Sequence, residues 1–215
     1  MKKIVIFGSG CHAKVVFSEI MRLKNYNFLG FVDDLSAKGK KVIRLENKNY
    51  SNLGKINDLR NKKNICGVIG VGSSILRKKI CDEINSKLKN FKFENIISKN
   101  SIVDKNVKFG KGNVIISNSV INTGTILGNH CLINTSSSID HDNIFEDFAG
   151  TGPGVVTGGK VKVGKMSYIG IGSVIKNTIN IGKNTFIGGS SFVNKNCSSN
   201  SLYFGVPAKK IKNLY

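Results

Sequence analysis

From Ile97 onward, the hydrophobic positions of the chain recur every six residues. Counting in sixes from Ile97 to Val193 meets an apolar residue at fifteen of seventeen positions, with no shift of register. An α-helix repeats about every 3.6 residues and an amphipathic strand about every two, so neither explains this pattern. A triangular parallel β-helix does, because each six-residue segment forms one face and directs one aliphatic side chain inward. We therefore expect a parallel β-helix over residues 96–215, in which each coil buries the faces of its neighbours.

Two threonines interrupt the hydrophobic series. Thr151 and Thr157 lie in the segment 148-FAGTGPGVVTGGKV-161, which is rich in Gly and contains Pro153. The simple interpretation is a local bulge or loop, and the functional one is a place where backbone amides are open to a ligand. Elsewhere Gly often follows the inward position, and we expect Gly and Asn at the corners because both tolerate positive φ. The tail 203-YFGVPAKKIKNLY-215 leaves the rhythm and should cap the β-helix.

The first 95 residues have a different pattern, in which short apolar runs alternate with helical segments. Strands are predicted at residues 2–7, 27–33 and 64–71, and helices from the glycine loop to Leu23 and over Ser74–Leu88. Strands and helices that alternate in this way are typical of a small parallel α/β domain. The sequence thus predicts two domains, a Rossmann-like domain over residues 1–95 and the β-helix over residues 96–215.

The segment 8-GSGCHA-13 follows the first predicted strand and precedes a helix, in the pattern G-x-G-x-x-A. A tight turn at a helix N-terminus presents backbone amides that favour phosphate, so the loop predicts a nucleotide site. The α/β part is about half of a full doubly wound domain, so one nucleotide diphosphate fits better than a dinucleotide. A tight connection without a ligand is the alternative. His12 could contact a ligand or cap the helix, and Asp33 and Asp34 could bind a base or ribose or form a plain turn.

Charge and cysteine usage narrow the choice of partners. The net charge of +20 suggests an anionic partner. The lysines are spread along the chain without a basic block or interleaved aromatics, so we expect no nucleic acid. Phosphate-bearing small ligands suit this surface, and so does a plain bias toward Lys and Asn. Five scattered cysteines without a C-x-x-C pair are typical of reduced thiols in the cytoplasm. No run of about 18 apolar residues is present, so no membrane span is expected.

With the glycine loop and the hexapeptides in place, the chain resembles a family of left-handed β-helix enzymes, the sialic acid O-acetyltransferases and nucleotide-sugar N-acetyltransferases. It is most similar to the bacterial UDP-4-amino-sugar acetyltransferases that make bacillosamine-type sugars. The resemblance covers nearly the whole length and rests, in order, on GSGCHAKVV, FVDD, GVGSSILRKKI, NTSSSIDHDNIFEDF and YFGVPAKKI. Hexapeptides alone are shared by many acyltransferases, whereas this ordered set is specific to the family.

The resemblance implies a homotrimer that uses acetyl-CoA to acetylate a UDP-linked amino sugar, with no metal. Acetyl-CoA would lie along a groove between neighbouring β-helices, and the N-terminal domain would hold the nucleotide sugar. The family's motifs place the catalytic base at His141, an acid that strengthens this base at Asp142, and a supporting polar residue at Asn134. They place nucleotide-sugar contacts at Cys11, His12, Ala13, Asp33, Asp34 and Gly72, and acetyl-CoA contacts at Gly150, Gly159, Ile171 and Gly189.

Two positions depart from the family's pattern. Many members have a second histidine nine residues after the first, near the thioester, and here that position is Gly150. This departure leaves open how the acetyl carbonyl is held and which acyl group or acceptor is used. Cys11 stands where the family more often has Gly.

Acetyl transfer from a thioester needs a deprotonated amine or hydroxyl, and a neutral His is the usual base near pH 7. A carboxylate on the far ring nitrogen fixes the tautomer, and Asp140 and Asp142 both flank His141. Adjacency in sequence leaves open which of the two makes contact. Backbone amides of residues 150–159 are candidates to stabilise the oxyanion.

Two other functions stay open at this point. An O-acetyltransferase of sialic acid or a related surface-glycan sugar would need the same base, so the sequence separates it poorly from an N-acetyltransferase. A non-catalytic trimeric scaffold that binds a nucleotide sugar is the alternative of another class. A zinc-dependent carbonic anhydrase needs three histidine ligands. The chain has three histidines in all, and His12 lies in the other domain, so we exclude this enzyme.

Overall fold

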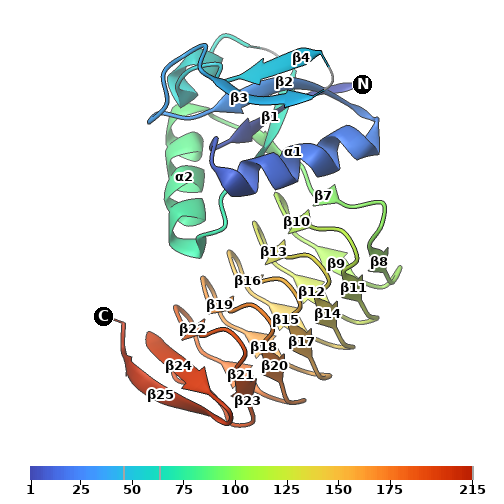
Figure 1. Ribbon diagram of the computed structural model, residues 1–215, viewed down its shortest axis with the longest axis vertical. Helices are drawn as coiled ribbons and strands as arrows, with labels where there is room; N and C mark the ends of the chain where they lie inside the picture. Colours follow the sequence, from blue (N-terminus) through green and yellow to red (C-terminus); the bar gives the residue numbers. More distant parts are fainter. Residues whose placement is uncertain (46, 63, 215) are drawn as a thin grey trace. The chain divides into compact units, whose positions relative to one another are not determined.

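The chain folds as two units, Met1–Ile96 and Ile97–Tyr215. The structure is a computed structural model that describes residues 1–45, 47–62 and 64–214, and Figure 1 shows both units. The division falls where the hydrophobic pattern changes its period, one residue after the boundary expected from the sequence. Tyr215, the last residue of the predicted cap, lies outside the described residues.

The first unit is built on a four-stranded parallel sheet in the order β2-β1-β5-β6. Its elements are β1 (Lys2–Phe7), α1 (Cys11–Leu23), β2 (Tyr26–Val32), β3 (Lys41–Leu45), β4 (Lys48–Ser51), the 3-10 helix η1 (Ile56–Leu59), β5 (Ile65–Ile69), α2 (Ser74–Lys87) and β6 (Lys92–Phe93). The side chains of β1 from Ile4 to Phe7 are buried, as is typical of a central parallel strand. α1 buries its apolar stripe, which includes Val16 and Phe17.

The strand order of this sheet determines where a ligand can bind. The chain leaves β1 through α1 to β2 on one side of the sheet, and it leaves β5 through α2 to β6 on the other side. The carboxyl ends of β1 and β5 therefore meet at the point where the strand order reverses. Parallel α/β sheets bind ligands at this point, because the loops on either side diverge and leave a crevice.

The antiparallel hairpin of β3 and β4 was not predicted, and neither was η1. None of the five residues of β3 is buried, so the apolar alternation that marks a strand is missing. One aromatic residue of β4 attaches the hairpin to the unit. The Tyr50 ring packs on Phe17 and Phe28, with ring centroids 4.8 Å and 5.5 Å apart.

The second unit is a left-handed parallel β-helix with three faces, as the sequence predicted. The eight-stranded face contains β7 (Ile96–Ile97), β10 (Val114–Ile115), β13 (Leu132–Ile133), β16 (Gly150–Thr151), β19 (Tyr168–Ile169), β22 (Phe186–Ile187), β24 (Ser201–Gly205) and β25 (Ala208–Asn213). The six-stranded face contains β8 (Ile102–Val103), β11 (Val120–Ile121), β14 (Ser138–Ile139), β17 (Val156–Thr157), β20 (Val174–Ile175) and β23 (Phe192–Val193). The five-stranded face contains β9 (Lys108–Phe109), β12 (Ile126–Leu127), β15 (Ile144–Phe145), β18 (Lys162–Val163) and β21 (Asn180–Ile181).

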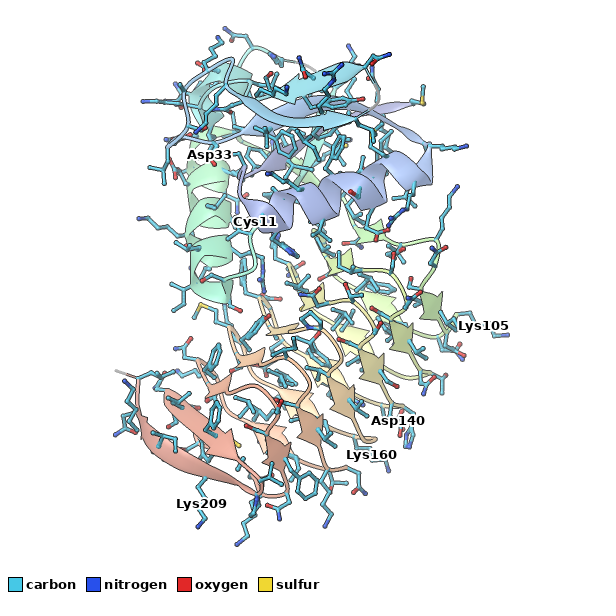
Figure 2. All side chains as sticks on the ribbon, in the orientation of Figure 1. Cys11, Asp33, Lys105, Asp140, Lys160 and Lys209 are labelled. Carbon is cyan, nitrogen blue, oxygen red and sulfur yellow. The ribbon has the colours of Figure 1, made fainter. Side chains whose placement is uncertain are left out.

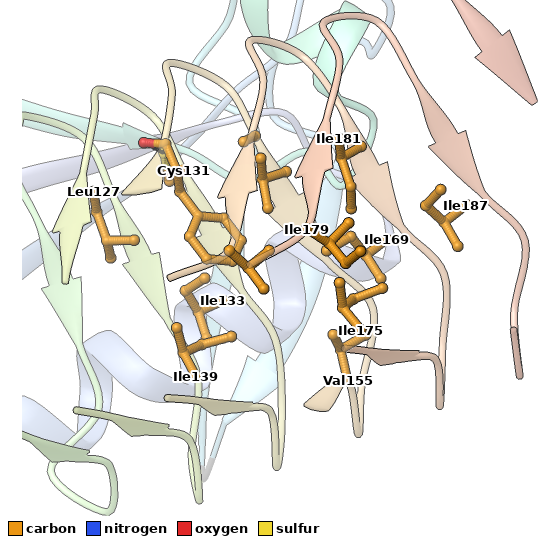
Figure 3. Close-up of a cluster of buried hydrophobic side chains, with 14 of the residues drawn as sticks. Leu127, Cys131, Ile133, Ile139, Val155, Ile169, Ile175, Ile179, Ile181 and Ile187 are labelled. Atoms are coloured by element: carbon orange, nitrogen blue, oxygen red, sulfur yellow. Dashed lines mark hydrogen bonds between the residues drawn. The ribbon is translucent and has the colours of Figure 1, made fainter. Parts of the chain in front are cut away.

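Each coil of the β-helix takes eighteen residues. Strands pair in parallel with the strands of the next coil, as Ile121 pairs with Ile139. The inward side chains of successive coils form one core, and Figure 3 shows part of it. Ile133, Ile139 and Ile169 are fully buried there. The six-residue hydrophobic period of the sequence is thus the spacing from one face to the next.

The two threonines occupy regular inward positions, so the predicted bulge or loop at residues 148–161 is wrong. Thr151 and Thr157 lie in strands β16 and β17 and are buried. The Thr151 hydroxyl accepts a hydrogen bond from the Asn134 amide (3.0 Å), and the Thr157 hydroxyl accepts one from the Asp140 amide (3.3 Å). Threonine is tolerated inside the coil because each hydroxyl finds a backbone donor in the preceding coil.

The corners have positive φ angles, as expected for the Gly and Asn residues there, but most corner residues are of other types. Residues with φ near +60° recur every six positions from Gly112 to Ser190, and only four of these fourteen are Gly. The glycines that follow inward positions serve a different purpose. A Cβ on Gly128 would lie 2.8 Å from the Asp147 amide nitrogen, so glycine there lets the next coil approach.

The segment predicted as a cap forms a hairpin at the end of the eight-stranded face. β24 pairs in parallel with β22 and antiparallel with β25, so β25 becomes the last strand of this face. Within the residues that the structure describes, no helix is both long and apolar enough to cross a membrane.

Candidate functional site

His141 lies at a corner of the β-helix, between β14 on the six-stranded face and β15 on the five-stranded face. We call the turns 140–143 and 158–161, which occupy this corner in successive coils, the His141 corner. Figure 2 labels Asp140 and Lys160 there. The carbonyl of His141 accepts a hydrogen bond from the Lys160 amide (2.9 Å), and the Asp142 amide donates to the Thr123 carbonyl (3.0 Å). The backbone that carries the histidine is therefore bound to the coil on each side.

The imidazole of His141 contacts the carboxylate of Asp142. The distance from His141 Nδ1 to Asp142 Oδ2 is 2.8 Å, and the two side chains are 49% and 52% exposed. A carboxylate only accepts hydrogen bonds, so Nδ1 carries the proton and Nε2 carries the lone pair. A neutral imidazole with its Nε2 lone pair open to a ligand can accept a proton from a nucleophile.

Two glycines in the neighbouring coils make room for this pair. A Cβ on Gly159 would lie 2.5 Å from His141 Nε2, and a Cβ on Gly124 would overlap Asp142 Oδ1. Gly159 is eighteen residues after His141, and Gly124 is eighteen residues before Asp142. The imidazole and the carboxylate thus lie along the corner between two positions that have no side chain.

Asp140 has a different role from Asp142. Its Oδ1 accepts hydrogen bonds from the backbone amide of His141 (2.8 Å) and from Asn122 Nδ2 (3.2 Å). These two donors, the backbone amide first, hold the pKa of the Asp140 carboxyl below its usual value. Of the two acids that flank His141, Asp142 therefore holds the ring and Asp140 holds the turn.

The backbone amide of Gly159 is a candidate donor to a developing oxyanion. The amides of Gly150, Gly152, Gly154 and Gly158 all donate to backbone carbonyls of adjacent coils. The Gly159 amide makes no hydrogen bond to any residue that the structure describes, and Gly159 is the residue whose Cβ would meet the His141 ring. A base and an unused backbone donor are thus adjacent at one corner.

Three of the other residues predicted on the β-helix lie at the preceding corner, between the eight-stranded and six-stranded faces. Ile171 is 61% exposed, and its Cγ2 lies 3.0 Å from the position of a Cβ on Gly189, one coil later. Asn134 lies at this corner two coils before Ile171, and its Oδ1 accepts a hydrogen bond from the Thr135 amide (2.9 Å). Within one chain, the structure does not bring these residues to His141, and their predicted roles stay predictions.

Gly150 lies in β16 on the eight-stranded face, in register with Leu132 and Tyr168. It follows His141 by nine residues, which is half of an eighteen-residue coil. A side chain at this position would point outward from a different face of the same β-helix. The structure therefore separates Gly150 from His141 within one chain.

The glycine loop connects β1 to α1 at the carboxyl edge of the first sheet. Gly10 is the N-cap of α1, it offers no side-chain cap, and no acid lies in the first turn. The first amides of the helix are therefore available to an anion. Ala13 fits the third position of the motif, because a Cβ on Gly70 after β5 would lie 2.9 Å from Ala13 Cα. Small residues at both positions let the helix approach the strand closely.

The two acids after β2 are engaged in the loops of this edge. Asp33 Oδ2 accepts hydrogen bonds from the Ser9 amide (2.9 Å) and hydroxyl (2.6 Å), and its Oδ1 accepts one from the Leu35 amide (2.9 Å). Asp34 Oδ1 accepts a hydrogen bond from the Ile56 amide (3.0 Å). Figure 2 labels Cys11, which is exposed, and Asp33 at this edge of the unit. Asp33 thus holds the glycine loop in place.

His12 and Gly72 lie at the same edge, near a buried arginine. Arg77 is 3% exposed, and it donates hydrogen bonds to the carbonyls of Gly72 (2.6 Å) and Val71 (3.2 Å) in the loop after β5. Burial, together with the Arg77 charge, lowers the pKa of His12 to about 4. His12 is therefore neutral at pH 7. A Cβ on Gly72 would meet open space.

Sequence reasoning missed Ser9 and Arg77. Ser9 is a variable position of the glycine motif, so only its contact with Asp33 reveals it. Arg77 stands within a helix among exposed lysines, and no local signal marks it as buried. In the part of the chain that the structure describes, no group of three His, Cys, Asp or Glu side chains is placed to hold a metal ion.

Both units resemble known proteins, the first in sequence and the whole chain in structure. Residues 3–84 match the family model described as the PglD N-terminal domain. The chain is similar to a GDP-perosamine N-acetyl transferase from Caulobacter crescentus, solved as a histidine-to-alanine mutant with CoA and GDP-perosamine. The TM-score is 0.86 with 25% identity, and the similarity covers 98% of this chain and 97% of that one.

Two further structures share the fold. The acetyltransferase domain of PglB from Neisseria gonorrhoeae, solved with acetyl coenzyme A, has a TM-score of 0.87 and 22% identity, over 98% of this chain and 99% of that one. AntD, an N-acyltransferase from Bacillus cereus solved with dTDP and coenzyme A, has a TM-score of 0.54 and 18% identity, over 62% of this chain and 89% of that one. The chain thus shares the architecture of the hexapeptide-repeat sugar acetyltransferases, an N-terminal domain of the PglD type joined to a left-handed β-helix, and this similarity supports an acyltransferase.

Proposed function

We propose that this protein transfers the acetyl group of acetyl-CoA to the amine of a UDP-linked 4-amino sugar, with His141 as the general base. The observation that carries the proposal is the geometry of the His141 corner. One ring nitrogen contacts Asp142 at 2.8 Å, and the other lies beside Gly159, whose amide is unused within the described residues. A base and an oxyanion donor are the two groups that acyl transfer from a thioester requires.

In the proposed reaction, the amine nitrogen attacks the thioester carbonyl directly. His141 Nε2 accepts the proton that the amine loses, and Asp142 stabilises the imidazolium. The Gly159 amide donates to the carbonyl oxygen as it becomes an oxyanion. The tetrahedral intermediate then collapses, the C–S bond breaks, and the imidazolium returns the proton to the sulfur of CoA. The products are an N-acetylated sugar and free CoA.

The first unit supports a nucleotide sugar as the acceptor. The uncapped N-terminus of α1 and the glycine loop favour the diphosphate. His12 is uncharged there at pH 7, so its ring can accept a hydrogen bond from the ligand as well as donate one. UDP follows from the resemblance to the bacillosamine-type enzymes, whereas related structures hold GDP-perosamine and dTDP. An acyl-transfer assay must therefore compare the three nucleotides.

Features of the second unit support the proposed donor and assembly. Related proteins are solved with CoA or acetyl coenzyme A, and we assign acetyl-CoA as the donor here. The outward side chains Ile102, Val156 and Val174 on the six-stranded face are 69%, 42% and 42% exposed in the single chain. Apolar side chains in a row on a rigid face favour a protein partner. We propose that copies of this chain cover them in a homotrimer, with acetyl-CoA in the groove between neighbouring β-helices.

An acyl-transfer assay tests the proposal. Purified protein and its His141→Ala variant are incubated with acetyl-CoA and UDP-, GDP- or dTDP-linked 4-amino sugars. A UDP-sugar without the amine and free sialic acid complete the panel of acceptors. CoA release and the mass of each acceptor are measured together. We expect a gain of one acetyl group on the UDP-4-amino sugar, and a loss of about 10²–10⁴-fold in rate without His141.

Each outcome of this assay has a clear meaning. Transfer only to a GDP- or dTDP-linked amine would keep the reaction and correct the nucleotide. Transfer to sialic acid would assign the protein to the O-acetyl branch of the family. Binding of a nucleotide sugar with no transfer to any acceptor would favour the scaffold. Equal rates for the two proteins would remove His141 from the mechanism.

A further inference from the structure

A buried asparagine connects the proposed base to the proposed oxyanion donor. Asn143 follows Asp142 in the turn that carries His141, and its side chain is fully buried. Its Nδ2 lies 2.8 Å from the carbonyl of Asp140, 3.2 Å from that of His141 and 3.0 Å from that of Gly158. All three neighbours are carbonyl oxygens, so the nitrogen must be the atom that faces them.

The contact with Gly158 acts on the Gly159 amide directly. The Gly158 carbonyl and the Gly159 N–H belong to one planar peptide group, in which they point in opposite directions. The hydrogen bond from Asn143 therefore fixes the orientation of the peptide that presents the Gly159 N–H. It also polarises this peptide, which makes the N–H a stronger donor. The same side chain amide holds the backbone of His141 one coil earlier.

A second observation sets Asn143 apart from an ordinary core position. Its Oδ1 is buried, and it has no hydrogen-bond partner among the described residues. An unsatisfied buried acceptor destabilises the fold. At the same position of the corner, the next two coils have Val161 and Ile179, which are buried in the apolar core. Stability alone would favour an aliphatic residue at position 143 as well.

A weaker form of the same contact occurs in the preceding coil. Thr125 occupies the position eighteen residues before Asn143, and its hydroxyl donates to the Asp140 carbonyl (3.1 Å). The backbone amide of Asn143 also donates a hydrogen bond to the Thr125 hydroxyl (3.3 Å). A threonine at position 143 could therefore donate to Gly158 in the way that Thr125 donates to Asp140. It would lack the contact with the His141 carbonyl.

We propose that Asn143 is a positioning residue for acetyl transfer, which sets the His141 backbone and the Gly158–Gly159 peptide relative to each other. The proposal rests on the proposed function, because it assigns the Gly159 amide to the oxyanion. Asn143 itself touches neither substrate. We expect it to act on the transition state, so a variant of Asn143 that lacks the donor should have a lower kcat and an unchanged KM.

The test compares three variants in steady-state kinetics. Asn143→Val removes the donor and matches Val161, and Asn143→Thr restores one donor to Gly158. Ser167→Val is the matched control, because the Ser167 hydroxyl makes the equivalent bond to the Gly182 carbonyl (2.6 Å) at another corner. We expect Asn143→Val to lower kcat on the order of 10²-fold, with KM for both substrates within about threefold of wild type. Asn143→Thr should recover about a tenth of the wild-type kcat or more, and Ser167→Val should behave as wild type.

Crystal structures of wild type and Asn143→Val give a readout that does not depend on activity. We expect the Gly158–Gly159 peptide to rotate or the His141 backbone to shift in the variant, with the rest of the β-helix unchanged. An unmoved corner would overturn the proposal, and so would a wild-type kcat in Asn143→Val or an equal loss in Ser167→Val. If the wild-type protein transfers no acyl group, the proposed function fails by itself. The two crystal structures then decide whether Asn143 sets this corner.

Discussion

His141 Nε2 lies where a side chain on Gly159 would be, since a Cβ on that glycine would come within 2.5 Å of the nitrogen. The φ angle of Gly159 is not in the left-handed region, so alanine is compatible with the backbone there. Gly159→Ala should therefore move the imidazole without unfolding the coil. Because a displacement of about 1 Å can cost on the order of 10²-fold in rate, we expect kcat to fall by about that factor.

A matched control separates this effect from a general change at the corner. Asn177 occupies the same corner position one coil after Gly159, and Asn177→Ala leaves the ring of His141 untouched. Its kcat should equal that of wild type. Steady-state kinetics and a crystal structure of each variant decide the matter. A Gly159→Ala protein with a displaced ring and full activity would contradict the role of His141.

The two acids beside His141 should respond differently to the same substitution. In Asp142→Asn, the side chain amide can donate to Nδ1, which places the ring proton on Nε2 and removes the base. Asparagine tolerates the left-handed φ of 56° at this position, so the fold should remain. We expect kcat to fall on the order of 10²-fold or more. Asp140→Asn keeps an oxygen for the His141 amide, and its kcat should change by less than about threefold.

Kinetics of these two variants, with thermal unfolding as a check on folding, test the assignment of the acids. Equal losses would mean that charge near the ring matters and that the direct contact with Asp142 does not. A larger loss in Asp140→Asn would exchange the roles of the two residues.

The repeat length of the β-helix predicts positions in the candidate site that local motifs do not. An eighteen-residue coil places Gly159 beside His141, and it places Gly150 half a coil away on another face. Six residues per face and three faces per coil are therefore sufficient to predict where Gly159 and Gly150 lie relative to His141. The period could not show which acid holds the ring, because this depends on the left-handed turn at Asp142 and on its side chain torsions.

In the first unit, the predicted strands and helices were confirmed to within a few residues, since buried apolar runs and the glycine loop mark them. The hairpin of β3 and β4 was missed, because its main attachment is the packing of Tyr50 on Phe17 and Phe28. Asp33 was expected to bind a ligand or to form a plain turn. Its carboxylate accepts hydrogen bonds from Ser9, a contact that was not predicted, and its role toward a ligand stays a prediction. Contacts between residues distant in sequence decide these features, and a local pattern does not contain them.

The apolar row on the six-stranded face predicts how the homotrimer can be broken. Replacing Val156 and Val174 together by Asp would place two charges in the proposed interface between copies, where desolvation is costly. We expect the double variant to elute as a monomer, with little acyl transfer. Leu35→Asp is the control, because Leu35 is fully exposed in the first unit. Light scattering after size-exclusion chromatography gives the masses, and a trimeric double variant would exclude this face.

His12 should make the folded protein sensitive to mild acid. Its pKa is lowered from 6.5 to about 4 by burial and by the Arg77 charge, so the native state stays unprotonated where the unfolded state takes up a proton. Its contribution to stability is complete above pH 6.5 and is lost as the pH falls toward 4. The loss is about 1 kcal/mol at pH 5.5 and up to about 3 kcal/mol near pH 4.

Urea unfolding of wild type and His12→Gln, measured from pH 7.5 to pH 5, isolates this contribution. Other acid-sensitive groups are common to both proteins, so the difference between the two free energies of unfolding reports on His12 alone. We expect the difference to shift in favour of the variant by about 1–2 kcal/mol over this range. The shift follows from burial beside a fixed positive charge, because both make the imidazolium unfavourable in the native state. A difference that stays constant with pH would mean that His12 is solvated and titrates normally in the folded protein. A shift in favour of wild type would mean that an anionic partner, and not Arg77, dominates its surroundings.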